Sequence, residues 1–145
     1  MKPINEMKII LESRSCNEAF ARSAVASFLS VLDPTIEEIS DVKTAVSEAV
    51  TNCIVHGYKE AIGKIYIQVR IYENARVSIT VRDKGCGIPD VQKAMEPLFT
   101  TCETGERAGI GFSIMGTFMD KLKVRSKPGK GTTVVLEKMI FSKGI

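Results

Sequence analysis

The sequence predicts one α/β domain, a two-layer sandwich in which a mixed, mostly antiparallel sheet is covered by helices on one face. Its 145 residues are enough for one well-formed hydrophobic core. Apolar residues recur at helical spacing in two early segments and alternate with polar residues in later ones. The predicted order is strand, two helices, two strands, two helices, two strands. Because strands and helices come in groups and do not alternate singly, a doubly wound parallel sheet is disfavoured.

The first half of the chain supplies a strand and two helices. Residues 7–11 form a short apolar strand, and Ser15 to Glu18 has the spacing of a capping box that opens a helix. The helix buries Phe20, Ala21, Ala24, Val25, Phe28, Leu29 and Leu32. Asp33 and Pro34 end it, with the proline in the first turn of a second helix over residues 35–55.

The second half is mainly strand. Alternating residues at 64–71 and 76–81, joined by a turn at Glu73 and Asn74, predict an antiparallel hairpin with one buried face. The later segments are a glycine-rich loop (83–89), a short helix (91–95), an irregular stretch (97–108), a helix (109–119), and two strands (122–126 and 132–138). No internal repeat or linker divides residues 1–145, which predicts a single domain.

Composition excludes several classes of function. The four cysteines, at positions 16, 53, 86 and 102, form no C-x-x-C pair, and the chain has one histidine, so neither a zinc site nor a disulfide framework is indicated. A net charge of +3 without a basic run disfavours direct nucleic-acid binding. The absence of a long apolar run and of a signal-peptide core predicts a cytoplasmic protein without a membrane segment.

Glu48 and Asn52 are the first candidates for chemistry. Four residues apart on the second helix, they project from the same face. In isolation such a pair would be two solvated surface residues. However, Glu48 lies between apolar neighbours, where a carboxylate can act as a base, and an amide oxygen such as that of Asn52 can bind a hard cation.

Two glycine motifs follow. Asp83, at the end of a strand, could accept a hydrogen bond from an amine such as that of adenine, and Gly85 and Gly87 would let backbone approach a ligand; a plain β-turn is an equal alternative. Gly109-Ile110-Gly111 opens a helix whose free amides favour phosphate. Arg107 could pair with a terminal phosphate or be a solvated loop residue, and the long polar segment before it is typical of a lid.

Taken in order, E-x-x-x-N on a helix, D-x-G-x-G after a hairpin, a lid and G-x-G opening a helix resemble the GHKL (Bergerat) ATPase superfamily. The segments SEAVTNCIVHGY (47–58), VRDKGCGIP (81–89) and PLFTT (97–101) are similar to the bacterial anti-sigma serine kinases, most of all the sporulation anti-sigma F factors. The resemblance covers about residues 7–138.

The resemblance implies a protein-serine kinase that uses ATP (or ADP) and Mg²⁺. Glu48 would be the general base, and Asn52 would ligate Mg²⁺ and bind ATP. Asp83 would bind the adenine amino group, with Thr133 nearby through water. The other implied ATP contacts are Gly85, Gly87, Thr100 and Thr101 in the lid, Arg107, Gly109 and Gly111.

It also implies partners. The protein would bind and inhibit an RNA polymerase sigma factor, sporulation sigma F by resemblance, and phosphorylate a serine of its anti-anti-sigma factor. Glu18 and Arg22 would face both partners; from spacing alone they would be a surface ion pair. A homodimer through the first strand is implied, with no direct nucleic-acid or membrane contact. Cys102 and Ala108 depart from the residues that many relatives carry there.

Two other functions remain open at this stage. The chain could be an ATP-dependent binding module without kinase activity, although Glu48 speaks against it. A histidine-kinase catalytic domain is disfavoured, because no phosphoacceptor or dimerisation helix is present in the sequence.

Overall fold

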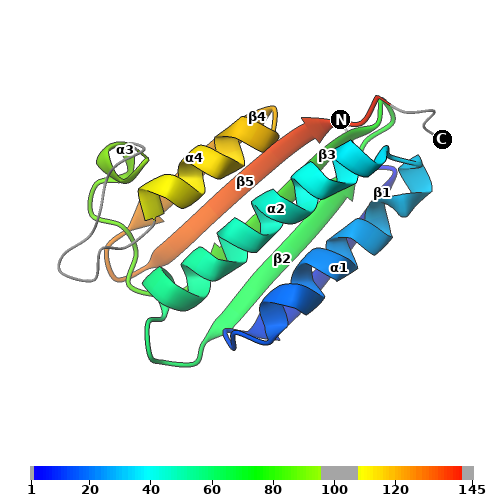
Figure 1. The fold of residues 1–145 in the computed structure, drawn as a ribbon. Helices are drawn as coiled ribbons and strands as arrows, with labels where there is room; N and C mark the ends of the chain where they lie inside the picture. The colour runs from blue at the N-terminus through cyan, green and yellow to red at the C-terminus, as the bar shows by residue number, and fades with distance from the viewer. Residues whose placement is uncertain (1, 96–107, 142–145) are drawn as a thin grey trace.

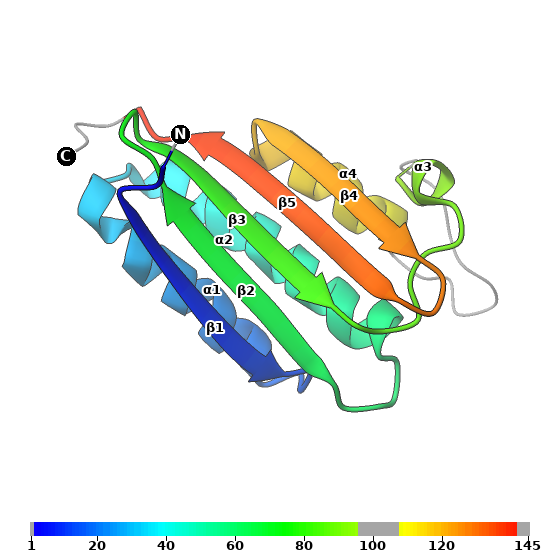
Figure 2. The same ribbon diagram turned by 180° about the vertical axis from the view of Figure 1, so that it is seen from behind.

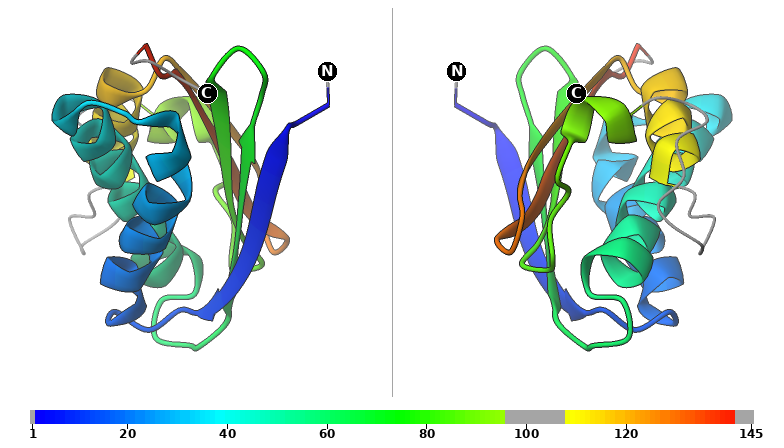
Figure 3. Two further views of the ribbon diagram at one scale, coloured as in Figure 1. Left: turned by 90° about the vertical axis from the view of Figure 1, so that its right-hand side faces the viewer. Right: turned by 90° about the vertical axis from the view of Figure 1, so that its left-hand side faces the viewer.

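The computed structural model describes residues 2–95 and 108–141 and has two layers, a five-stranded sheet and helices on one of its faces (Figures 1 and 3). The sheet order is β1-β2-β3-β5-β4. The elements are β1 (Asn5–Glu12), α1 (Asn17–Leu29), η1 (Ser30–Leu32), α2 (Ile36–Asn52), η2 (Cys53–Gly57), β2 (Lys64–Ile71), β3 (Arg76–Asp83), α3 (Val91–Ala94), α4 (Ala108–Phe118), β4 (Lys121–Lys127) and β5 (Gly131–Met139).

The predicted fold class is confirmed, with one correction. All four strand pairs of the described sheet are antiparallel, so the sheet is not mixed. The helices α1 and α2 lead from β1 to β2, which pairs antiparallel with β1. The later helices lead from β3 to the edge strand β4, and β5 then returns between β3 and β4, antiparallel to both. The two-layer arrangement therefore does not need a parallel pair.

The start of α1 differs from its prediction. Cys16, not Ser15, is the N-cap residue; it has helical dihedrals and makes no side-chain cap. The Glu18 carboxylate accepts a hydrogen bond from Ser47 on α2 instead of closing a capping box. Phe20, predicted to be buried, is 56% exposed.

The capping box belongs to α2. Its N-cap Thr35 accepts from the Glu38 N–H, and the Glu38 carboxylate accepts from the Thr35 N–H. Pro34 thus precedes the N-cap and lies outside the first turn. Two acidic residues in that turn, Glu37 and Glu38, also complement the helix dipole.

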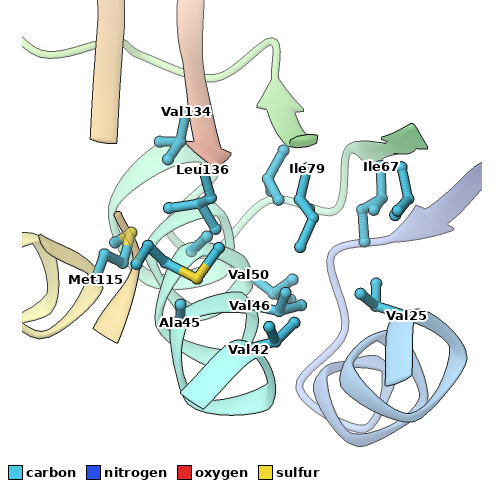
Figure 4. Close-up of a cluster of buried hydrophobic side chains, with 14 of the residues drawn as sticks. Val25, Val42, Ala45, Val46, Val50, Ile67, Ile79, Met115, Val134 and Leu136 are labelled. Atoms are coloured by element: carbon cyan, nitrogen blue, oxygen red, sulfur yellow. The ribbon is translucent and has the colours of Figure 1, made fainter. Parts of the chain in front are cut away.

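The core lies between α1, α2, α4 and the inner face of the sheet. Figure 4 shows Val42, Val46 and Val50 of α2 directed at Ile67 and Ile79 of the sheet. Alternation along β2 and β3 buries one side of each strand completely, as the sequence predicts. In Figure 1, α2 runs across the middle of the sheet between α1 and α4, so its C-terminal end is held beside the end of β3.

None of the helices within residues 2–95 and 108–141 combines the length and the apolar character needed to cross a bilayer.

Candidate functional site

A cavity of about 960 Å³ opens where α2 and β3 end. Its volume is at the upper end of what small-molecule sites occupy. The polar part of the wall includes Asn52, Asp83 and Thr132. The apolar part includes Ala49, Val81, Ile88, Ala94, Phe112 and Val134. A few polar groups in an otherwise apolar wall are typical of a site for a flat, partly polar ligand.

Asn52 is the last α-helical residue of α2. From Cys53 to Gly57 the chain continues as one π-helical turn, a feature that is frequent at functional sites. The side-chain Nδ2 of Asn52 is buried and has no hydrogen-bond partner among the described residues. Since buried polar groups are normally paired, this amide is suited to bind something that the protein itself does not supply.

The orphaned Nδ2 is a hydrogen-bond donor and suits a phosphate oxygen, whereas the Oδ1 of the same amide is the atom that would hold Mg²⁺. Mg²⁺ takes oxygen ligands and is commonly held by one or two protein groups together with substrate phosphates. Within the described residues, no group of three or more His, Cys, Asp or Glu could hold a metal ion. An ion beside Asn52 would therefore take most of its ligands from a bound phosphate chain and water.

Glu48 lies one turn before Asn52, and Gly111 on α4 faces both. A Cβ added at Gly111 would lie 3.2 Å from Glu48 Oε1 and 3.4 Å from both Oδ1 and Nδ2 of Asn52. The glycine thus lets α4 approach the two side chains closely. Gly109 also lies in the first turn of this helix, as predicted.

This arrangement brings the N-terminal end of α4 to Glu48 and Asn52. Amides in the first turn of a helix have no partner within the helix and favour anions. A carboxylate, a carboxamide and a helix N-terminus therefore converge from two elements that are far apart in sequence.

Asp83 ends β3 and is only 4% exposed. Its Oδ1 accepts hydrogen bonds from the N–H groups of Gly85, at 2.9 Å, and Thr132, at 3.3 Å. Burial raises the pKa of the Asp83 carboxyl above its usual range, while these two donors and the Cys53 thiol act in the opposite direction. Burial, and then the nearby Asp83 charge, raise the pKa of Cys53 well above its usual range, so the thiol remains a donor.

The glycine loop after β3 packs on the π-helical turn. The Cys86 N–H donates to the Gly57 carbonyl at 2.9 Å, and a Cβ at Gly85 would lie 2.2 Å from the same oxygen. Gly87 has φ +77°, which few other residues adopt readily. Gly85 is needed for this packing and is not part of the cavity wall, whereas Gly87 lines it.

Thr133 does not line the cavity; the neighbouring Thr132 does. Val134 and Leu136 of β5 are buried under the helices, and side chains alternate along a strand. Thr132 therefore shares their face, while Thr133 lies on the open face of the sheet. The prediction was wrong by one residue because the spacing of the final turn does not fix the register of β5.

A second, more open groove of about 480 Å³ lies between α1 and α2. Its lining includes Glu48 and Ser47 of α2 and Arg22 of α1. Ser47 Oγ donates to Glu18 Oε2 at 2.7 Å, and Arg22 pairs with the same oxygen at 3.4 Å. The structure thus joins Glu18 and Arg22 to the wall that carries Glu48, a relation that sequence spacing does not reveal.

Sequence reasoning also missed Cys53, Gly57 and Thr132. A Cβ at Gly57 would lie 2.8 Å from Asp83 Oδ2, so this glycine makes room for the carboxylate. The glycine at the end of a predicted helix was a visible signal, but its neighbour across the cavity was not. Thr100, Thr101 and Arg107 lie outside the described residues.

Residues 12–138 match the family model described as "Histidine kinase-like ATPase domain". The chain is 57% identical over 142 residues to the anti-sigma F factor of Thermoanaerobacter sp. (strain X514), covering 98% of this chain and 99% of that protein. It is 53% identical to the anti-sigma F factor of Geobacillus kaustophilus (strain HTA426), covering 94% and 93% of the two chains.

Solved structures share the fold. The RsbU and RsbW domains of a Mycobacterium tuberculosis protein match with a TM-score of 0.68 at 19% identity, covering 95% of this chain and 33% of that one. The histidine kinase domain of a blue-light activated kinase from Erythrobacter litoralis matches with a TM-score of 0.56 at 21% identity, covering 85% and 60%. This chain thus spans about a third of the first solved chain.

Proposed function

This chain belongs to the histidine kinase-like ATPase family and, within it, to the anti-sigma F factors; from that premise we propose that it holds a sigma factor and phosphorylates a serine of the matching anti-anti-sigma factor. One observation carries the proposal. Glu48 and Asn52 meet the first turn of α4 at Gly111, with the large cavity beside Asn52 and the open groove beside Glu48.

The cavity is the proposed ATP site. Asp83 is buried, with two backbone donors on Oδ1, and it would accept a hydrogen bond from the adenine amino group, with Thr132 beside it in place of Thr133. The apolar wall would hold the purine ring. The loop at Gly85 and Gly87 shapes this part of the site.

The phosphates would extend toward the first turn of α4, at Gly109 and Gly111. Mg²⁺, when bound by Asn52 and the phosphates, neutralises negative charge on the phosphate chain. Arg107 remains a proposed phosphate contact, and Thr100 and Thr101 remain proposed ATP-binding residues of the lid.

Glu48 is the proposed base. Its groove reaches Arg22, so a protein serine docked against α1 could enter from the side opposite the nucleotide. Glu48 would accept the hydroxyl proton while the serine oxygen bonds to the terminal phosphorus and the bond from that phosphorus to ADP breaks. In this arrangement the nucleotide and the acceptor reach the base from different openings.

Both protein partners would contact α1 through Glu18 and Arg22, and the protein would act in the cytoplasm. A homodimer through the exposed edge of β1 is part of the proposal. Sporulation sigma F is the proposed sigma factor.

The test incubates the protein with radiolabelled ATP, Mg²⁺ and the candidate anti-anti-sigma factor. We expect acid-stable phosphoserine on the partner, and E48Q should abolish it while ATP affinity changes less than about threefold. Equal phosphorylation of the partner by the wild type and by E48Q would contradict the role of Glu48. Tight ATP-dependent partner binding with no phosphoserine would favour the binding module, and acid-labile phosphate would indicate histidine chemistry.

A further inference from the structure

The sheet face that no helix covers carries a cluster of positive charge at one side. Figure 2 shows this face with β4 at its edge beside β5 and β3. Along β4, Leu122 and Val124 pack against the core, so the alternate residues Lys123, Arg125 and Lys127 point outward and are exposed.

Arg82 extends the cluster to the interior of the sheet. Arg125 pairs with Thr133, and Thr133 pairs with Arg82, so these side chains form one row across β4, β5 and β3. The Arg82 guanidinium lies 4.6 Å from the ring centre of Tyr66 in the next strand. This stacking holds a cation on the open face at a fixed place.

We name Lys123, Arg125, Lys127 and Arg82 the basic cluster. Within residues 2–95 and 108–141 none of the four forms an ion pair, whereas Arg70 and Arg76 on the same sheet pair with Glu6 and Glu137. The cross-strand neighbours Thr133 and Val135 are uncharged. The cluster is thus concentrated positive charge without internal neutralisation.

Protection of the sheet edge does not by itself account for the basic cluster. Lysines on an edge strand discourage pairing with other chains. Arg82, however, belongs to β3, which is flanked by β2 and β5 and has no exposed edge. A cation held there can act only on the open face of the sheet and not on its edge.

We propose that the basic cluster docks an acidic segment of a protein partner. The cluster spans about 14 Å along β4 and about 10 Å across three strands. Four charges over that footprint match a short row of carboxylates, whereas duplex DNA commonly engages six to ten phosphates. That the partner is a protein rests on the proposed function, in which both partners are proteins.

The cluster is also linked to the cavity. Gly129, in the turn that follows Lys127, donates from its N–H to the Cys86 carbonyl at 2.6 Å. Cys86 and Gly87 line the cavity, so the loop beside the proposed ATP site rests on the turn beside the cluster. Docking at the basic cluster and nucleotide binding in the cavity would thus both depend on the hydrogen bond between this turn and this loop.

The test measures binding of a short labelled peptide with glutamate at every second position, a spacing of about 7 Å that matches β4. Wild type is compared with the double variant K123E/K127E and with the control K2E/K64E, which changes the net charge equally at exposed lysines outside the cluster. We expect the first double variant to lose at least about tenfold in affinity, the control less than about twofold, and wild-type affinity to fall between 50 and 200 mM salt.

Equal affinity of all three proteins, or equal losses in both double variants, would overturn the proposal. Tighter binding of duplex DNA than of the peptide, lost in K123E/K127E, would also overturn it and assign the cluster to nucleic acid. If K123E/K127E melts early, K123Q/K127Q repeats the comparison without charge reversal. ATP binding and serine phosphorylation are measured on the same samples: their absence in wild type contradicts the proposed function, while the peptide result still decides the cluster.

Discussion

Ser47 Oγ donates a 2.7 Å hydrogen bond to Glu18 Oε2, and this bond ties α2 to α1 one residue before Glu48. Arg22, one turn further along α1, pairs with the same carboxylate oxygen at 3.4 Å. Glu18 is therefore oriented by two elements. A partner that binds Glu18 meets a side chain that is already fixed, and the contact leads to the groove of the proposed base.

S47A tests this connection. The substitution removes the donor and leaves Glu18 held by Arg22 alone, so affinity for a partner that contacts Glu18 should fall about fivefold, corresponding to about 1 kcal/mol for one hydrogen bond. Calorimetric titration with the sigma factor and with the anti-anti-sigma factor measures the change. S40A is the matched control, because Ser40 lies in the same groove on the same helix without a hydrogen bond to Glu18. Equal effects of S47A and S40A would contradict the assigned role of the bond.

G111A should impair the site more than the fold. The added methyl would lie 3.2 Å from Glu48 Oε1, so either that carboxylate or α4 must shift. We expect serine phosphorylation to fall at least about tenfold. Nucleotide affinity should also fall if α4 shifts, because its first turn would then move away from Asn52, which the methyl itself reaches only at 3.4 Å, an ordinary contact distance.

G116A is the control on the same helix. A Cβ there meets only Leu122 Cδ2 at 4.0 Å, and alanine favours a helix over glycine by up to about 1 kcal/mol. Its melting temperature should stay the same or rise, with unchanged turnover. Full activity of G111A would show that the close approach of α4 to Glu48 and Asn52 is not needed for phosphorylation.

Much of the fold was predictable because it depends on local periodicity. The alternation in β2 and β3 and the apolar stripe of α2 each specify which face is buried, and the structure confirms them. The start of α1 was not predictable from spacing. A serine and a glutamate three apart form a capping box only if no better partner exists, and Glu18 finds Ser47 across a helix interface.

The site residues likewise fall into two groups, those whose proximity follows from the local sequence and those that only the tertiary structure brings together. Glu48 and Asn52 share a helix face, so their proximity follows from the sequence. Their approach to Gly111 depends on how α4 crosses α2, and the assignment of Thr132 depends on the register of β5, both of which are tertiary. Those relations had no local signal.

D83N should weaken ATP binding, and the same carboxyl group should make the ATP affinity of the wild type depend on pH. The two backbone donors occupy Asp83 Oδ1, so the substituted amide would keep its oxygen there and turn an N–H₂ group toward the adenine amine, placing two donors face to face. A loss of about tenfold or more in ATP affinity is expected by fluorescence titration.

The wild type provides the pH test of the same group. Burial raises the pKa of Asp83, so protonation begins at higher pH than for an ordinary aspartate, and ATP affinity should start to fall there as the pH is lowered. For folding the sign is opposite. The buried carboxylate costs stability when ionised, and this cost lessens as the pH falls toward and below the raised pKa. ATP affinity that is flat with pH in the wild type, or D83N that binds normally, would contradict the adenine contact.

Glu38 connects the N-terminal end of α2 to the backbone after β5, and its substitution should lower the free energy of unfolding in a pH-dependent way. Oε1 accepts from the Thr35 N–H at 2.9 Å, and Oε2 accepts from the Phe141 N–H at 2.7 Å, so one carboxylate caps α2 and holds the backbone after β5. Burial alone would raise the pKa of Glu38, but the hydrogen bonds from Thr35 and Phe141 and the charge of Lys138 outweigh it and lower the pKa. A lowered folded pKa means that the contribution is present above the unfolded pKa and is lost as the pH falls through the folded one.

E38Q should therefore cost about 1 kcal/mol at pH 7 by urea unfolding, since the amide has one accepting oxygen for two donors. The difference from wild type should shrink as the pH is lowered through the acidic range, where the native Glu38 becomes protonated. E37Q, at the exposed neighbouring position, removes an equal charge from the same turn and should cost only a few tenths of a kcal/mol. A loss in E38Q that does not exceed that of E37Q, or that stays constant down to low pH, would mean that the carboxylate's two hydrogen bonds do not stabilise the fold.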